Sequence, residues 1–248
     1  MQDQTAAEDG RFLLTLANQE RVRARAVVIA SGARYRRLDV DNLASFEGSC
    51  VHYWASPLEG RLCSRQEVAL VGGGNSAGQA AVYLSSQVAK VWLIVRKPDL
   101  AANMSRYLVE RITATPNIEI LTQTTVTALD GQDGILEAIR CRSHRSGDAR
   151  KLAIRHLFLF IGADPNTDWL SRSGVTLDDK GFVRAGTDIH KPLETNLPGV
   201  FAIGDVRSGS IKRVAAAVGE GAQVVAALHG FLAEPGDRAA LPANTRRQ

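Results

Sequence analysis

The sequence predicts an α/β fold, and three observations carry that prediction. Short apolar segments alternate with helical segments along much of the 248-residue chain. A glycine-rich turn joins an apolar strand to a helix of small residues within Glu67 to Leu84. Two further segments read as antiparallel strands around Asp130 to Gly134, which adds a β-meander. Alternating strands and helices are typical of a parallel sheet with helices packed on its faces.

The composition excludes several classes of function. The formal net charge is +4, from 30 basic and 26 acidic residues, and only 6% of residues are aromatic. No basic face with interleaved aromatics is evident, so we expect no nucleic-acid partner. The first ten residues resemble no leader peptide, and no run reaches the roughly 18 apolar residues of a membrane span. We therefore expect a cytoplasmic protein without a membrane partner.

The cysteines and histidines predict neither a disulfide framework nor a metal site. Cys50, Cys63 and Cys141 form no CxxC motif, and so sparse a set indicates a reducing compartment. No histidine lies at metal-ligand spacing from Cys, Asp or Glu along the sequence. No side chain is predicted as a catalytic acid, base or nucleophile. The histidines are His52, His144, His156, His190 and His229.

The opening segment predicts strands that lack a partner in the sequence before them. Phe12 to Leu16 and Arg21 to Ala24 alternate in polarity around Asn18, a pattern that favours a hairpin. Val27 to Ala30 then reads as a short buried strand. Because isolated strands are unstable, we expect this segment to complete a sheet formed later in the chain or one absent from it.

The central segment predicts a βαβ unit, with Glu67 to Leu84 followed by a strand at Val91 to Val95. Its glycine pattern is GxGxxA. Gly72 permits the tight turn, Gly74 lets a pyrophosphate approach the backbone, and Ala77 keeps the helix close to the sheet.

Free amides near Asn75 and Ser76 would face the anion, aided by the helix dipole. The flanking strand and helix favour a dinucleotide site over the alternative, a glycine-rich turn that serves only packing.

Two basic residues after the second strand predict the choice of dinucleotide. Arg96 stands where an acidic residue would bond the ribose of NADH and an arginine would accept the 2′-phosphate of NADPH. Lys97 adds a point charge. Asp99 is near the distance expected of a ribose-binding acid, but it follows Pro98 beyond the strand. The sequence therefore predicts NADPH, and the alternative is a solvated basic strand end.

The rest of the chain continues the alternation. A helix is predicted from about Ser105 to Thr113, and another from Lys212 to Ala233, while 234–248 is expected to be disordered. Further strands are predicted at Ile118 to Leu121, Thr124 to Leu129, Ile135 to Arg142, His156 to Ile161, which Gly162 closes, and Val200 to Ile203.

Four ordered motifs resemble the low-molecular-weight thioredoxin reductase branch of the pyridine-nucleotide-disulfide oxidoreductases. AVVIASGA at 26–33 is similar to the crossover between the flavin and NADPH domains, and LVGGGNSAGQAA at 70–81 to the NADPH loop. FIGADPN at 160–166 is similar to the return crossover, and TNLPGVFAIGDV at 195–206 to the second flavin motif. The phrases around these motifs resemble more closely the reductase-like module of bacterial fusions with a cyclic-nucleotide-binding domain.

The resemblance implies a Rossmann-like NADPH domain with a β-meander, inserted in the remnant of a second Rossmann-like domain that binds FAD. It assigns 1–47 to the first FAD-domain segment, 48–163 to the NADPH domain, 164–233 to the returning FAD segment and 234–248 to a tail. By resemblance, Gly204 and Asp205 belong to the flavin motif, although Asp205 is equally explained as a strand-end cap. Arg213 and Val214 would begin a helix directed at the flavin ring.

The chain departs from the family in two ways. No flavin-binding GxGxxG loop precedes the segments described above, which predicts a truncated FAD site, and the family's CxxC falls on Ala55 to Leu58. A redox pair of Cys50 and Cys63 is a weak alternative. His52 and Tyr53 lie beside this region in the sequence. Two interpretations are open: the pair borders a bound nicotinamide, or it packs inside the protein.

The expected function is passage of hydride from NADPH to FAD and on to an unknown acceptor, without a dithiol. The alternative is an NADP(H)-binding module without flavin turnover, and a third is a regulatory or oligomerisation partner. The resemblance alone implies a homodimer.

Overall fold

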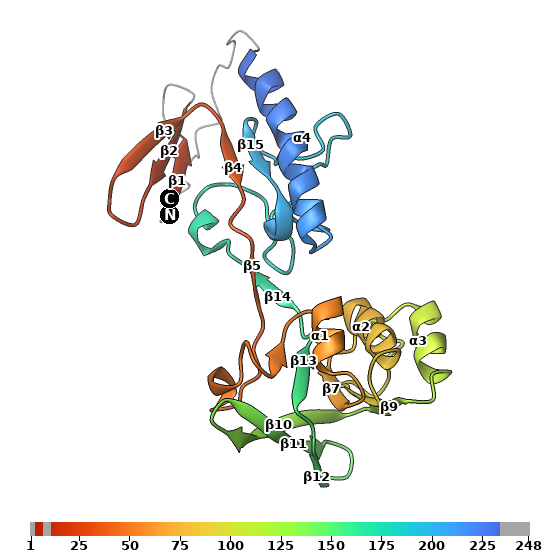
Figure 1. Cartoon of the computed structure of the whole chain (residues 1–248). Coiled ribbons are helices and arrows are strands. Elements are labelled where there is room, and N and C mark those ends of the chain that lie inside the picture. Colours follow the sequence, from red (N-terminus) through yellow and green to blue (C-terminus); the bar gives the residue numbers. More distant parts are fainter. Residues whose placement is uncertain (1–2, 7–10, 234–248) are drawn as a thin grey trace. The chain divides into compact units, whose positions relative to one another are not determined.

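The protein forms two compact units, each described by itself. The computed structural model describes residues 3–6 and 11–233 (Figure 1). One unit combines Met1–Arg34 with Ala163–Gln248, and the other is Tyr35–Gly162. Strands β5 (Ala33–Tyr35) and β14 (Ala163–Pro165) pair where the chain passes between the units. The expected tail at 234–248 lies outside the described residues.

The unit 35–162 is built on a parallel five-stranded sheet in the order β6-β13-β7-β8-β9. Helices α1 (Pro57–Leu62), α2 (Asn75–Ser85) and α3 (Arg106–Thr113) lie on one side of this sheet (Figure 1). The antiparallel strands β10 (Thr124–Gln132), β11 (Ile135–Ser143) and β12 (Ala149–Leu152) lie on the other. The parallel strands are β6 (Val51–His52), β7 (Glu67–Val71), β8 (Lys90–Ile94), β9 (Ile118–Leu121) and β13 (His156–Leu159).

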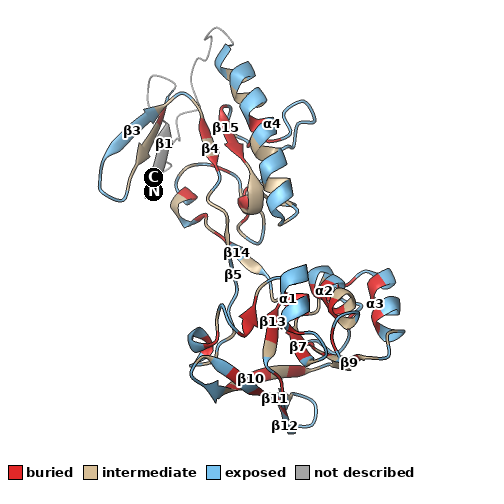
Figure 2. Ribbon diagram, viewed as in Figure 1, coloured by how far each residue is buried: buried red, intermediate tan, exposed pale blue. Residues whose placement is uncertain are grey.

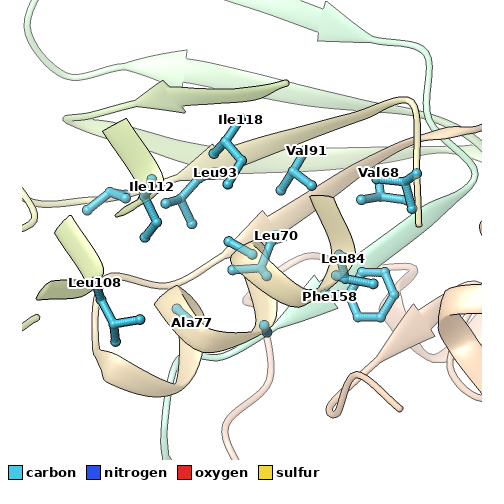
Figure 3. Close-up of a cluster of buried hydrophobic side chains, with 14 of the residues drawn as sticks. Val68, Leu70, Ala77, Leu84, Val91, Leu93, Leu108, Ile112, Ile118 and Phe158 are labelled. Atoms are coloured by element: carbon cyan, nitrogen blue, oxygen red, sulfur yellow. The ribbon is translucent and has the colours of Figure 1, made fainter. Parts of the chain in front are cut away.

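Two apolar cores form on the two faces of this sheet because successive strand side chains point to opposite faces. On the helical face, Leu70 and Leu93 pack against Leu84 of α2 and Ile112 of α3 (Figure 3). On the meander face, Ala69 packs in a cluster with residues from β10 and β11. The expected βαβ unit and meander are therefore present.

The first predicted domain boundary lies inside this unit. Residues 35–47 carry Leu43 and Phe46, each 2% exposed, and both belong to the meander-face core. The 3-10 helix η1 (Leu43–Ser45) places them there. Because their apolar side chains are buried among 35–162 residues, this segment belongs with that unit and not with the preceding strands.

Helix α1 was not predicted, although its signal is in the sequence. Ser56 caps the helix, and its backbone amide donates to Glu59 Oε2 at 2.9 Å, which makes a capping box. Pro57 occupies the first turn, where no amide donor is needed. Strand β12 was also missed. It follows the turn at Gly147, whose φ is 79°.

In the other unit, β2 (Phe12–Thr15) pairs antiparallel with β1 (Asp3–Ala6) and β3 (Arg21–Ala24), so the predicted hairpin is present. Strand β4 (Val27–Ile29) pairs parallel with β15 (Val200–Ala202). The strand without an earlier partner therefore completes a sheet with a segment that follows much later in the chain, which is one of the two outcomes expected for it.

Helix α4 (Val214–Ala233) follows β15 and the 3-10 helix η3 (Gly204–Val206), while η2 is Asp168–Leu170. Most of α4 is exposed, as Figure 2 shows, and Val214 and Val218 are 83% and 67% exposed. Among the described residues, α4 is long and apolar enough to cross a membrane by length and composition alone. The mean hydropathy of its 18-residue window is 1.3. This test averages hydropathy along the helix, and α4 passes it although no continuous apolar run of that length exists, since Glu220, Gln223 and His229 interrupt it.

Candidate functional site

The turn between β7 and α2 has the geometry that its glycines predict. At Gly72 an added Cβ would lie 2.6 Å from the Phe160 carbonyl oxygen and 2.9 Å from the Cβ of Ala77. Ala77 itself is fully buried. Gly72 and Ala77 thus bring the start of α2 close to the sheet, and any side chain at position 72 would push them apart.

Gly74 has a different reason to be glycine. It is the N-cap of α2 with an extended backbone, and an added Cβ would meet only the Asn103 carbonyl oxygen, at 3.9 Å. Packing inside the protein therefore does not require a glycine there. No side chain caps the helix at this position, and Asn75 and Ser76 are exposed. The first turn of α2 thus offers backbone amides to an anion.

The segment leading into α3 lies against this turn, which the sequence did not reveal. The Ser105 amide donates to Asn75 Oδ1 at 2.7 Å, so the Asn75 side chain joins the two helix starts. A Cβ at Gly78 would lie 2.8 Å from Met104 Sδ. Asn75 therefore has a positioning role in addition to the amide role predicted for it.

Arg96 and Lys97 lie just beyond the carboxyl end of β8, and both are exposed. The parallel neighbours β7 and β8 end at the same edge of the sheet. The glycine turn follows β7 and the basic pair follows β8, so both lie at that edge. Among the described residues, the Arg96 side chain has no hydrogen-bond or ion-pair partner. The Asp99 carboxylate accepts from the Ala102 amide at 3.0 Å, which gives it a turn-forming role.

The predicted flavin-motif residues lie in the other unit. Gly204 has a φ of 72°, and its amide donates to Glu220 Oε2 of α4 at 2.6 Å. Arg207 Nε donates to Glu220 Oε1 at 3.2 Å. Burial opposes ionisation of Glu220, but the hydrogen bonds from Arg207 and Gly204 hold its pKa below the usual range. Glu220, which the sequence did not single out, fixes the turn at Gly204.

Asp205 is half-buried, and its carboxylate makes no hydrogen bond among the residues that the structure describes. Lys212 Nζ donates to the Asp205 carbonyl oxygen at 3.3 Å. Arg213 is exposed, and α4 begins at Val214 beside it. The structure thus brings Gly204 and Asp205 into one turn held to α4, and the side chain of Asp205 is left for another contact.

Gly162 ends the unit 35–162. Its φ is 99°, and its carbonyl oxygen accepts from the Arg36 amide at 3.0 Å. An added Cβ would lie 3.9 Å from the Arg36 side chain. Glycine is needed here for its backbone conformation, which joins β13 to the crossing strand β14.

His52 and Tyr53 are engaged in packing. The His52 ring is 7% exposed and lies 4.8 Å from the Phe158 ring. Burial and the neighbouring His156 lower the pKa of His52 to about 4. Tyr53 donates to Glu47 and stacks on Tyr35 at 5.7 Å, and burial with the Glu47 contact raises its pKa to about 12. Of the two interpretations left open, these contacts support ordinary packing.

The cysteines do not form a redox pair. All three are free and buried. Cys50 lies in the core on the meander face of the sheet, where its Sγ contacts the Leu136 amide at 3.4 Å. Cys63 lies in the core on the helical face. The sheet separates the two thiols, so the alternative Cys50–Cys63 pair has no geometric support.

Sequence spacing was misleading about metal ligands. The ligand atoms of His52, Cys63 and His156 all lie within 4.8 Å of one another. They come from β6, the end of α1 and β13, which are far apart in the sequence. The absence of ligand spacing along the sequence therefore did not exclude a cluster in space, because the parallel sheet brings distant segments together.

A family model described as pyridine nucleotide-disulphide oxidoreductase matches residues 3–221. The chain belongs to this family. The match spans both units and includes the glycine turn, the crossing strands and the Gly204 turn.

Relatives within the family point to its thioredoxin reductase-like members. The chain is 32% identical over 235 residues to a thioredoxin reductase of Mycolicibacterium smegmatis, covering 94% of this chain and 73% of that protein. It is 33% identical over 218 residues to a component of the alkyl hydroperoxide reductase of Pseudomonas putida, covering 88% of this chain and 40% of that protein.

Among solved structures, a thioredoxin reductase from Giardia duodenalis matches with a TM-score of 0.79 and 25% identity, covering 94% of this chain and 74% of that one. The thioredoxin reductase from Streptococcus pyogenes gives 0.75 and 27%, covering 93% and 72%. The fold is therefore the two-domain nucleotide-binding fold of this family. The chain spans 40% to 73% of the length of the curated relatives named above.

Proposed function

We propose that the unit 35–162 binds NADPH and that the whole chain acts in a flavoprotein oxidoreductase, passing hydride from NADPH to FAD and on to an acceptor. The observation that carries the proposal is the β7–α2 turn, where Gly72 cannot bear a side chain and Gly74 could bear one without an internal clash. A glycine that packing does not require is explained by a ligand that approaches the backbone.

The NADPH site would use backbone and side chains in separate roles. The amides of Asn75, Ser76 and Ala77 would bind the pyrophosphate at the start of α2. Arg96 would bind the 2′-phosphate through its planar fork, and Lys97 would add charge. The absence of an internal partner for Arg96 among the described residues supports this assignment.

The residues present also fit part of an FAD site. The Asp205 carboxylate accepts no hydrogen bond from the described residues and is therefore able to accept one from a ligand. The start of α4 at Arg213 and Val214 is exposed. The Gly204 amide is already bonded to Glu220, so Gly204 would contribute its turn and not its donor. When bound, FAD would supply hydride acceptance and onward electron transfer. The chain's role is then to hold the ribitol and to place a positive helix end near the ring.

The acceptor is proposed to take electrons without a protein dithiol. In this sequence Ala55 to Leu58 occupies the position that resemblance gives to the CxxC, and it forms the start of α1 with Ser56 as cap. Two electrons from NADPH would then reach an acceptor that reacts with flavin directly, such as a quinone, a redox protein or oxygen. The three free cysteines support the expected reducing, cytoplasmic setting.

The test uses the purified chain. Visible flavin absorbance that bleaches on addition of NADPH supports the flavoprotein proposal. A colourless protein that binds NADPH, followed by nucleotide fluorescence, supports the alternative of an NADP(H)-binding module without flavin turnover. Failure to bind either would contradict both and favour a regulatory role. Light scattering of the same sample tests the expected homodimer.

Two finer expectations accompany this proposal. The domain assignment of 48–163 to NADPH and of the flanking segments to FAD is proposed with the first boundary moved to Arg34, where the units divide. We also propose, from the resemblance, that the chain is related to the reductase-like module of proteins that carry a cyclic-nucleotide-binding domain.

A further inference from the structure

A cluster of three metal-ligand side chains lies beneath α1, apart from the glycine turn. His52 Nε2 and His156 Nδ1 are 3.1 Å apart. Cys63 Sγ completes a group whose ligand atoms are all within 4.8 Å. Nothing in the proposed function uses these side chains. We propose that they form a binding site for a divalent cation of borderline softness, with Zn²⁺ as the probe.

The sheet register explains why the two histidines meet. Strands β6 and β13 are parallel neighbours, and His52 pairs with Phe158. His156 is two residues before Phe158, so its side chain points to the same face of the sheet. The Cys63 side chain reaches that face from the end of α1, where it caps the helix.

The donor set and spacing fit a zinc ion. Two imidazole nitrogens and one thiolate match its preference for nitrogen and sulfur ligands. With Zn–N near 2.0 Å, Zn–S near 2.3 Å and a tetrahedral angle, the nitrogens stand about 3.3 Å apart and nitrogen and sulfur about 3.5 Å apart. The histidine nitrogens are already at 3.1 Å, and Cys63 Sγ lies within 4.8 Å of each, so the thiolate completes the set by moving toward them.

Burial shapes the site further. Cys63 is fully buried and His52 is 7% exposed, whereas His156 is half-buried. An ion would enter on the His156 side, and its fourth position would be held by water. Binding replaces the hydrogen bond between the imidazoles with two coordinate bonds. It also replaces the thiol proton with the metal, so one proton is released for each ion bound.

The expected effect is to fasten two short elements, β6 and α1, to β13. Strand β6 has only two residues, and α1 has six. A bound ion would link β6 and α1 to β13 through the three side chains. Because an ion that binds only the folded state stabilises that state, the link adds to the stability of the protein. We expect the melting temperature to rise with Zn²⁺ concentration.

Cobalt substitution gives a direct test on the purified, metal-stripped chain. We expect one Co²⁺ per chain with a thiolate-to-cobalt charge-transfer band, displaced by an equal amount of Zn²⁺. Cys63→Ser should abolish this band, and His156→Asn should weaken metal affinity by about 100-fold or more, beyond the losses typical of outer-shell changes.

Cys141→Ser and His144→Asn are the matched controls. Cys141 is 1% exposed and belongs to the other core, and His144 is an exposed histidine of the same unit. Both should keep the wild-type spectrum and affinity. If Cys63→Ser fails to fold, the His156→Asn titration decides. A wild-type protein without a thiolate band, or with affinity unchanged by His156→Asn, would overturn the proposal.

Discussion

The carbonyl oxygen of Phe160 lies over Gly72, at 2.6 Å from the place where a side chain would begin. Phe160 follows β13, and its amide donates to the Val71 carbonyl oxygen at 2.8 Å. Two neighbouring strands of the sheet therefore meet at the turn that begins the candidate NADPH site. This contact leaves no room for a side chain at Gly72, whereas Gly74 has room for one, so packing requires glycine only at position 72.

A pair of alanine substitutions tests that separation. Gly72→Ala should destabilise the protein by about 2 kcal/mol, because its Cβ would clash with backbone that cannot easily move. Gly74→Ala should leave the free energy of unfolding nearly unchanged, since its Cβ meets nothing closer than 3.9 Å.

The same Gly74→Ala protein should bind NADPH at least about tenfold more weakly if the pyrophosphate approaches the backbone there. Urea unfolding and nucleotide fluorescence measure the two quantities. Unchanged NADPH affinity in folded Gly74→Ala would count against the site.

Arg96→Ala tests the choice of dinucleotide. Loss of a charge-assisted hydrogen bond of about 1.5 to 3 kcal/mol predicts NADPH affinity lower by roughly 10- to 100-fold, with NADH affinity little changed. The ratio of the two dissociation constants is the measurement. Arg142→Ala removes an exposed arginine from β11 and is the control. An unaltered ratio in Arg96→Ala would assign Arg96 to the solvated strand end.

Glu220→Ala tests the connection between α4 and the Gly204 turn. Glu220 and Arg207 have side chains only 14% and 21% exposed, so removal of one partner leaves a partly buried charge. We expect a loss of about 2 to 3 kcal/mol in the free energy of unfolding. If the turn holds a flavin, flavin content should fall as well. Arg106→Ala, which breaks the exposed pair with Glu110, should cost much less.

The Glu220 interaction should also depend on pH. Its pKa in the folded protein is below the ordinary value of 4.5. The unfolded state therefore binds the proton first as pH falls, so the stabilisation is complete above pH 4.5 and is lost as pH falls through the folded pKa. The stability difference between wild type and Glu220→Gln should shrink over that range. A difference that is constant with pH would contradict the assignment.

Thiol chemistry tests the separation of the cysteines. Mild oxidation of the native chain should give no Cys50–Cys63 disulfide, since the two side chains lie in cores on opposite faces of the sheet. Burial raises the pKa of Cys141 to about 11, so its thiol should react slowly with alkylating reagents until the protein unfolds. Peptide mapping by mass spectrometry measures both outcomes, and a Cys50–Cys63 crosslink in folded protein would contradict the structure.

Much of the fold was predictable because its signals are local. The glycine turn, the continuous apolar runs of β7 and β8 and the turn before β11 each lie within a short window, and each element formed as expected. Helix α1 was missed although Ser56 and Glu59 carry its capping signal, because its six residues give too little periodicity.

The site was predictable to the same extent. Gly72, Gly74 and Ala77 lie within six residues of one another, so their spacing in the sequence is enough to predict how they are arranged in space. The contact of Asn75 with Ser105 and that of Glu220 with Gly204 join separate elements, and no periodic pattern records them.

The sequence by itself determined the α/β class, the glycine turn between β7 and α2 and the place of the basic pair at Arg96, because adjacent residues act together in each. Tertiary structure decided which distant residues meet. It paired β4 with β15, separated Cys50 from Cys63 and brought His52, Cys63 and His156 together. The physical reason is that a parallel sheet pairs strands through crossover connections, so its neighbours are set by the packing of whole elements and not by distance along the chain.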